Sequence, residues 1–319
     1  VDDYKKQGFQ IEHVRRGTRN GYKAGALKHA MQTTDTELVA IFDADFIPPT
    51  WFLNRALPHF STSNIGLVQC RWGHVNENYS AITQAQALSL DFHFLIEQKA
   101  KSNSHLFMNF NGTAGIWKRD CIEDAGGWHT ATLVEDLDLS YRAQMKGWKC
   151  VFLPNIVVDA ELPVQMNAAK RQQFRWAKGS IQCAIKLLSD ITLKRKVSIE
   201  AKIQAFIQLT RHIVYPLMLI QFLALPILLA GQVNLYVVSI LPAITIATYL
   251  AMGPGAYIMI IQTMYHKSWK SKVKILPALL VYNAGMSVNN TVAVFDAVFG
   301  KKNEFLRTPK YGIITKDDD

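Results

Sequence analysis

The sequence contains few cysteines, and they form no pattern. There is no CxxC pair and no histidine at the spacing of a zinc ligand, which excludes a zinc ribbon and a disulfide framework. No signal peptide precedes the first polar segment, and residue 1 is Val rather than Met. We interpret the cysteines as reduced thiols of a domain that faces the cytosol; they are Cys70, Cys121, Cys150 and Cys183.

Charge is missing from one long segment. Residues 213–265 contain no Asp, Glu, Lys, Arg or His, whereas a transmembrane helix needs only about 20 apolar residues. The segment therefore predicts a transmembrane hairpin with crossings at 213–230 and 235–252. Basic residues flank it, at Arg211 before and within 266–270 after, so the positive-inside rule places both ends in the cytosol. A soluble core is a poor alternative, because soluble helices rarely stay uncharged on every face.

Elsewhere positive charge is in excess. Lys and Arg outnumber Asp and Glu by 35 to 25, and the net charge of +10 suits phosphate-bearing substrates, an anionic bilayer or nucleic acid. Many basic residues lie in 163–212, where apolar residues recur at helical spacing, as in helices on a membrane surface. A solvated pair of basic helices fits this stretch equally well. Nucleic acid is the poorest partner, because anionic lipid beside the apolar segment explains the charge.

The first half of the chain alternates short apolar runs with amphipathic stretches. This alternation predicts an α/β fold with a mainly parallel sheet. Gly147 is placed to end one of the helices. The expected strands are 38–42, 65–70 and 149–153, and the expected helices are 23–31 and 136–146.

Four regions follow from these patterns. We expect a catalytic α/β domain at 1–162, interfacial helices at 163–212, the membrane hairpin at 213–265, and an interfacial helix with a polar segment at 266–319. In the last region the predicted helix has an apolar face against a polar one. The apolar face carries Val288, Thr291, Val292, Phe295 and Phe299, and the polar face carries Asn289, Asn290 and Asp296.

Two carboxylates follow the first strong strand. Asp43 and Asp45 are separated by one residue and come directly after the run LVAIF. The carboxyl end of a parallel strand is where α/β sheets bind ligands, and paired carboxylates there can hold a divalent cation against a diphosphate. Because DxD strings are common, a solvated turn is the alternative for the motif alone.

A second acidic pair opens the helix predicted at 136–146. Glu135 and Asp136 stand in LVEDLD, where carboxylates also favour the helix dipole. A base that takes a proton from a sugar hydroxyl must be an ionised carboxylate beside the reacting carbon. Asp136 is the candidate, with Glu135 beside it.

The basic region contains the string QQFRW. Arg175 offers planar, bidentate donors for a leaving diphosphate, and Trp176 offers a flat apolar face for a sugar ring. A Trp beside an Arg also suits a membrane headgroup anchor, so the string alone leaves both interpretations open.

Taken in order, these motifs resemble the family 2 processive glycosyltransferases, which include cellulose synthase and the cellulose-synthase-like mannan and glucan synthases. That family has a DxD, a later ED, then QxxRW ahead of a transmembrane hairpin, as seen here at 43–45, 135–136 and 172–176. The strings NGYKAGALK (20–28) and FNGTAGIW (110–117) are most similar to the mannan and glucan synthase branch. The resemblance implies a GT-A type, Rossmann-like catalytic domain.

The resemblance also implies roles for single residues. Asp136 would be the general base, and Trp176 with Glu135 would lie at the acceptor. Asp45, with Asp43, would bind a divalent metal, Mg²⁺ or Mn²⁺. The segment 305–312 resembles the gating loop FxVTxKG of that family, with Arg307, Pro309 and Tyr311 as departures from its pattern. Contacts with the nucleotide sugar would come from Lys23, Asp43, Gln172, Arg175, Thr308 and Lys310.

The expected function is inverting transfer of a hexose from UDP-glucose or GDP-mannose to a growing β-linked polysaccharide such as β-1,4-glucan or mannan. The protein would be integral to the plasma membrane or a Golgi-type membrane, with its catalytic domain in the cytosol. The family's first strand and first aspartate motif are expected to precede Val1. Two alternatives are a single-transfer enzyme acting on a polyprenyl phosphate or ceramide, and a membrane scaffold or transporter subunit that only binds nucleotide sugars.

Overall fold

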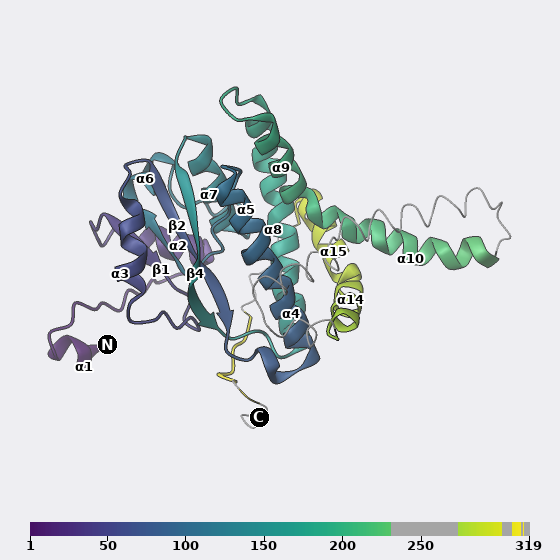
Figure 1. The fold of residues 1–319 in the computed structure, drawn as a ribbon, viewed down its shortest axis with the longest axis horizontal. Coiled ribbons are helices and arrows are strands. Elements are labelled where there is room, and N and C mark those ends of the chain that lie inside the picture. Colours follow the sequence, from purple (N-terminus) through teal and green to yellow (C-terminus); the bar gives the residue numbers. More distant parts are fainter. Residues whose placement is uncertain (231–273, 302–307, 314, 316–319) are drawn as a thin grey trace.

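The computed structural model describes residues 1–230, 274–301, 308–313 and 315. An α/β part is joined to a group of long helices, one of which, α10, extends well away from the rest (Figure 1). The strands are β1 (Leu38–Ile41), β2 (Ile65–His74), β3 (Gly115–Lys118) and β4 (Lys149–Ala160). The helices of the α/β part are α1 (Asp2–Lys6), α2 (Tyr22–Ala30), α3 (Phe52–Ala56), η1 (Leu57–Phe60), η2 (Glu77–Tyr79), α4 (Ala81–Phe92), η3 (His93–Gln98), α5 (Lys99–Asn103), α6 (Arg119–Asp124) and α7 (Glu135–Met145). The long-helix part contains α8 (Met166–Leu193), α9 (Ile199–Thr210), η4 (Arg211–Ile213), α10 (Val214–Ala230), α14 (Leu276–Gly285) and α15 (Ser287–Val298).

The sheet is mixed, and the expectation of a mainly parallel sheet is wrong. The strand order is β1-β3-β2-β4. β3 pairs antiparallel with both β1 and β2, and only β2 and β4 pair in parallel. The three predicted strands are present, and β1, β2 and β4 run in one direction. The short strand β3 was not predicted, and its insertion between β1 and β2 makes the sheet mixed.

The sheet is buried on both faces, which explains why its strands are apolar runs rather than alternating patterns. Leu67 and Trp117 belong to the core on one face, with Phe94 and Phe110. Their neighbours Val68 and Ile116 belong to the core on the other face, because successive side chains of a strand point in opposite directions.

The basic region forms two helices, as predicted. Helix α8 has 28 residues, and α9 is capped at its N-terminus by Ser198, whose hydroxyl accepts a hydrogen bond from Ala201 N at 3.2 Å. A core of buried side chains joins these helices to α7, with Tyr141 from α7 and Leu187 from α8. All four cysteines are free thiols, as predicted.

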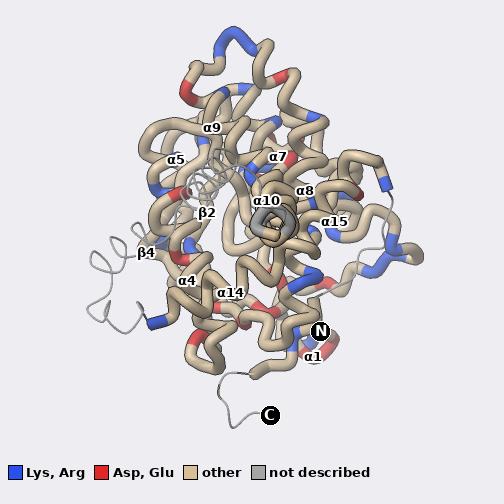
Figure 2. Tube along the Cα trace, turned by 90° about the vertical axis from the view of Figure 1, so that its right-hand side faces the viewer, with Lys and Arg blue, Asp and Glu red and all other residues tan. Residues whose placement is uncertain are grey.

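Helix α10 contains no Lys, Arg, Asp or Glu and covers the first predicted crossing (Figure 2). Within the described residues one helical stretch, Ile199–Ala224, is long and apolar enough to cross a membrane, with 26 residues and a mean hydropathy of 1.2. The second predicted crossing, 235–252, lies outside the described residues.

Helix α15 is amphipathic as predicted, but its polar side chains are the buried ones. Asn290 and Asp296 are buried against the neighbouring helices, and Thr291, which we assigned to the apolar face, is buried with them. Helix α15 packs along α8. Near this interface Lys178 Nζ of α8 donates to Lys301 O at 2.5 Å, and Lys301 Nζ lies 3.8 Å from Asp296. Four apolar side chains of the predicted apolar face are exposed, namely Val288, Val292, Phe295 and Phe299.

Candidate active site

The DxD motif lies where β1 ends. Asp43 N donates to Thr113 Oγ1 at 2.8 Å, which joins the motif to the loop before β3. The carboxylate of Asp43 forms an ion pair with Lys23 of α2. Asp45 Oδ2 lies 2.8 Å from Lys310 Nζ, so the second carboxylate faces the end of the chain. The motif thus faces two lysines that are far apart in the sequence.

Gly112 lies between this motif and the predicted base. Lys23 Nζ donates to Gly112 O at 2.7 Å. A Cβ atom at Gly112 would stand only 2.9 Å from Asp136 Oδ2, and the residue has a φ of +84° that disfavours other residue types. Only glycine therefore allows this close approach between the loop and the carboxylate of Asp136.

Asp136 occupies the first turn of α7, and its side chain is half-buried at the edge of a cavity. Its Oδ1 accepts a hydrogen bond from Leu137 N at 2.8 Å. Burial and the neighbouring Glu135 raise the pKa of Asp136 to about 7, although Leu137 and Lys23 oppose the shift. Burial also raises the pKa of Glu135, again opposed first by Lys23. A carboxyl group with a pKa near neutrality is well suited to accept a proton and release it again.

A buried ion pair attaches α7 to α8. Asp138 has a fully buried side chain and lies 2.5 Å from Lys186 Nζ of α8 and 2.8 Å from Arg142 Nη2. The helix that begins at Asp136 is therefore held against the helix that carries QQFRW.

The QQFRW string contributes two side chains to the same region. Arg175 Nη2 donates to Thr308 Oγ1 at 2.9 Å. Burial lowers the pKa of Arg175, and the negative charges of Asp43 and Glu135 oppose that shift, so the guanidinium faces both predicted acidic motifs. Trp176 lines the cavity described below. Gln172, one turn before Arg175 and Trp176, is half-buried on the same side of α8.

The segment that resembles a gating loop lies over the motifs, in the part described at 308–313. Besides the contact between Thr308 and Arg175, Lys310 Nζ donates to Glu161 O. The backbone N–H groups of Tyr311 and Gly312 donate to the Glu161 carboxylate at 3.1 and 2.9 Å. Residues 305–307 of this segment, including Arg307, lie outside the described residues.

A cavity of about 650 Å³ opens beside Asp136. Its size lies within the range of pockets for small ligands. Its wall combines aromatic rings with amide, hydroxyl and charged groups, the mixture that suits sugar rings and their hydroxyls. Representative lining residues are Asp136, Asn111, His93, Glu97, Arg211 and Trp176.

The structure thus brings the other predicted site residues together. For Gln172 it shows a position on α8, one turn before Arg175 and Trp176. Sequence reasoning missed Glu161 and Thr113. Glu161 directly follows β4, so the rule that ligands bind at the carboxyl ends of parallel strands had the signal to find it. Thr113 and Gly112 stand in FNGTAGIW, whose glycines signal a close backbone approach. His93 and Glu97 gave no signal, because they lie in a largely apolar helical stretch, and Arg211 was interpreted only as a basic flank of the uncharged segment.

Comparison with known proteins decides the family. A model described as glycosyl transferase family group 2 matches residues 38–258. The chain belongs to this family. The matched range contains Asp43, Asp45, Asp136, Arg175 and Trp176, so the predicted resemblance to family 2 glycosyltransferases is confirmed.

Curated relatives in glycosyl transferase family group 2 agree with the predicted branch. The chain is 41% identical over 222 residues to the probable glucomannan 4-beta-mannosyltransferase 7 of Oryza sativa subsp. japonica. The aligned region covers 68% of this chain and 38% of that protein. It is 34% identical over 317 residues to glucomannan 4-beta-mannosyltransferase 9 of Arabidopsis thaliana, covering 97% of this chain and 57% of that protein. The chain therefore spans between about two fifths and three fifths of the length of these relatives.

A solved structure shares the fold. The mannosyltransferase PcManGT from Pyrobaculum calidifontis, in complex with GDP-Man and Mn²⁺, matches with a TM-score of 0.52 and 17% identity, covering 92% of this chain and 70% of that one. The predicted GT-A type of fold is therefore confirmed in its general form, a mixed α/β sheet with flanking helices.

Proposed function

We propose that this chain is the catalytic core of an inverting glycosyltransferase that transfers mannose from GDP-mannose to the end of a β-1,4-linked mannan or glucomannan. The mannosyl group and the linkage follow the curated relatives, which are glucomannan 4-beta-mannosyltransferases. The observation that carries the proposal is the place of Asp136, a half-buried carboxyl group with a raised pKa between a cluster of cations and a cavity suited to sugars.

Three cations surround the DxD motif. Lys23 pairs with Asp43, Lys310 pairs with Asp45, and Arg175 faces Asp43 and Glu135. Cations from separate segments around one point form a site for a diphosphate, with Arg175 able to bind two oxygens at once. We assign this region to the diphosphate of the nucleotide sugar.

The chemistry of the carboxylates fits a divalent metal. In the described residues no group of three or more His, Cys, Asp or Glu side chains could hold a metal ion alone. Mg²⁺ and Mn²⁺ are, however, commonly held by one or two carboxylates together with substrate phosphates. Asp45, with Asp43, would hold such an ion, and the ion would offset the charge of the departing diphosphate.

The reaction is a single displacement. Asp136 accepts the proton of the acceptor hydroxyl while that oxygen bonds to the anomeric carbon of the donor sugar, and the bond from that carbon to the diphosphate oxygen breaks. The nucleoside diphosphate leaves with the bonding electron pair, and Arg175 and Lys310 stabilise its charge. Attack from the face opposite the leaving group inverts the anomeric centre.

Membrane attachment is part of the proposal. Apolar side chains on α9, α10, α14 and α15 are exposed, among them Ile207 at 61%, Leu223 at 61%, Val281 at 73% and Phe299 at 77%. Exposed apolar surface of this extent is typical of a contact with lipid. The cavity reaches the start of α10, at Val214 and Tyr215, so an elongating chain would move from Asp136 toward the membrane helices.

The test uses the full-length protein in membranes with radiolabelled GDP-mannose or UDP-glucose, followed by digestion of the product with β-1,4-mannanase. We expect labelled polymer from GDP-mannose that the enzyme degrades, and none from Asp136→Asn. Label that is extracted with lipid would support a single transfer to a lipid acceptor instead. Polymer made by Asp136→Asn at the wild-type rate would contradict the assignment of the base.

A further inference from the structure

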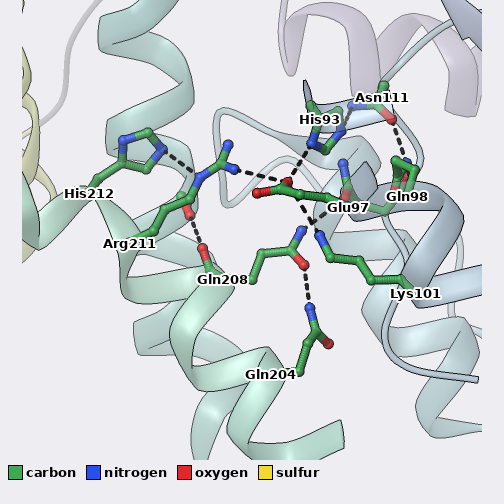
Figure 3. Close-up of polar contacts among 11 residues, drawn as sticks. His93, Glu97, Gln98, Lys101, Asn111, Gln204, Gln208, Arg211 and His212 are labelled. Carbon is green, nitrogen blue, oxygen red and sulfur yellow. Dashed lines mark hydrogen bonds and ion pairs between the residues drawn. The ribbon is translucent and has the colours of Figure 1, made fainter. Parts of the chain in front are cut away.

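One wall of the cavity holds a polar cluster that the proposed reaction does not use. Glu97 Oε2 lies 2.8 Å from His93 Nδ1, and 3.6 Å from both Lys101 Nζ and Arg211 Nη1 (Figure 3). The residues come from η3, α5 and η4, so one carboxylate joins three elements. Arg211 belongs to the short connection between α9 and the apolar helix α10.

A π-helical turn directs this cluster toward the active-site loop. η3 is a single π-helical stretch between α4 and α5, with hydrogen bonds from residue i to i+5. His93 and Gln98 are the first and last residues of this stretch. Both contact one side chain, Asn111 (Figure 3). Such turns are frequent at functional sites.

The hydrogen bonds fix the orientation of Asn111. Gln98 Nε2 donates to the backbone oxygen of Asn109 at 2.6 Å, which identifies the nitrogen end of the Gln98 amide. The same nitrogen donates to Asn111 Oδ1 at 2.8 Å. The Asn111 amide therefore points its Nδ2 toward His93 Nε2, at 2.9 Å.

The state of His93 follows from this orientation. Asn111 Nδ2 can only donate, so His93 Nε2 must be the unprotonated, accepting nitrogen. The ring proton then lies on Nδ1 and is donated to Glu97. Burial lowers the pKa of His93 and favours this neutral form, and the charges of Lys101 and Arg211 act in the same direction while Glu97 opposes them.

Asn111 precedes Gly112, the loop residue that lies against the carboxylate of Asp136. The backbone N of Asn111 donates to Gln69 Oε1 at 2.9 Å, and a Cβ atom added at its neighbour Gly112 would stand 2.9 Å from Asp136 Oδ2. Asn111 and Asp136 both line the cavity. A shift of the Asn111 side chain would therefore move the loop against which Asp136 lies.

We propose that His93 and Glu97 are positioning residues for the transfer step, acting through Asn111 on the loop that contacts Asp136. This inference rests on the proposed function, since it assigns a role within the same reaction. Glu97 fixes the tautomer of His93, the accepting nitrogen of His93 fixes the Asn111 amide, and the fixed loop holds the base toward the acceptor hydroxyl. Displacing a reacting group by about 1 Å costs on the order of a hundredfold in rate.

The test compares His93→Gln with His93→Phe in the full-length protein in membranes. The glutamine offers an oxygen that accepts the Asn111 N–H, whereas the phenylalanine fills similar space without an acceptor. We expect His93→Phe to lower kcat by about ten- to a hundredfold with the donor KM changed by less than about twofold, and His93→Gln to retain most of the wild-type kcat. His59→Phe, at an exposed histidine of η1, is the matched control.

A second pair keeps the test decisive if His93→Phe does not fold. Glu97→Gln keeps an acceptor for His93 Nδ1–H and Glu97→Ala removes it, while both lose the same charge. We expect a kcat near that of the wild type for the first and a reduced kcat for the second. An unchanged kcat in His93→Phe, or equal losses within either pair, would overturn the inference. Wild-type protein that transfers no sugar from any donor would instead overturn the proposed function.

Discussion

At the scale of single residues, Asp136 stands out because its burial opposes stability. Its pKa is raised from 3.8 to about 7 in the folded protein. The folded state therefore binds more protons than the unfolded state between these values, and the stability that this group contributes is present below about pH 4 and lost as the pH rises to about 7. Above pH 7 the loss amounts to at most about 4 kcal/mol.

Asp136→Asn is expected to be inactive and more stable than the wild type at pH 8, with the difference vanishing near pH 4. Melting temperatures of both proteins in the same detergent at three pH values would measure this. In the wild type, kcat should rise with pH through about 7, because only the ionised carboxylate accepts a proton. A wild-type melting temperature that increases steadily from pH 5 to 8 relative to Asp136→Asn would contradict the prediction.

Gly112→Ala tests the close approach between the loop and the base. The added methyl group would stand 2.9 Å from Asp136 Oδ2, whereas Gly127, with a φ of +74°, has no atom within 4 Å of the same position. Both alanine variants carry a similar backbone strain of about 1 kcal/mol. We expect Gly127→Ala to transfer sugar normally and Gly112→Ala to lose on the order of tenfold or more in kcat. Initial rates corrected for the amount of folded protein would compare them.

At the scale of elements, the ion pair between α7 and α8 carries the next prediction. Asp138 is fully buried and bonds to Lys186 and Arg142. Leaving a buried charge without a partner costs about 3 to 5 kcal/mol, but Arg142 remains beside Asp138 when Lys186 is removed. Lys186→Met is therefore expected to lower the free energy of unfolding by less than about 3 kcal/mol, measured by thermal or denaturant unfolding. Lys146→Met, at an exposed lysine of α7's end, is the control; equal stability of the two variants would argue against the ion pair as a link.

Elements also show what the sequence can and cannot predict. Helices α2 and α7 and strands β1, β2 and β4 follow from local patterns of apolar residues, and the structure contains them. β3 is four residues long and becomes a strand only because β1 and β2 flank it, so its pairing is a property of the fold. The amphipathic pattern of α15 was predicted, but its packing on α8, which buries Asn290 and Asp296, is not visible in the local pattern.

The site was easier to predict than its surroundings. Asp43, Asp136 and Arg175 stand in short motifs whose chemistry is visible in the residue types alone. The contacts of Lys310 with Asp45 and of Asn111 with His93 join positions far apart in the chain, and no local pattern specifies them. The cavity likewise arises from the packing of several helices rather than from any one segment.

At the scale of the whole molecule, the exposed apolar faces predict where the bilayer lies. A fluorescent probe attached at Phe299→Cys is expected to be quenched by nitroxide-labelled lipid and protected from iodide in water. A probe at Glu123→Cys, on the exposed surface of α6, should show the opposite. Both variants would be made in a protein whose four native cysteines have been replaced. Equal quenching of the two probes by iodide would contradict a lipid contact at α15.

Helix α15 and residues 308–313 pack back onto the first part of the chain, and this limits where the chain can be truncated. Helix α15 covers Lys178 on α8, and residues 308–313 place Thr308 on Arg175 and Lys310 on Asp45. A truncation at the first apolar helix would therefore uncover Lys178 and remove Lys310, one of the three cations around the proposed diphosphate site. A catalytic fragment without residues 231–273 would instead need residues 274–313 reattached through a short linker, so the segments on either side of 231–273 belong to one folding unit.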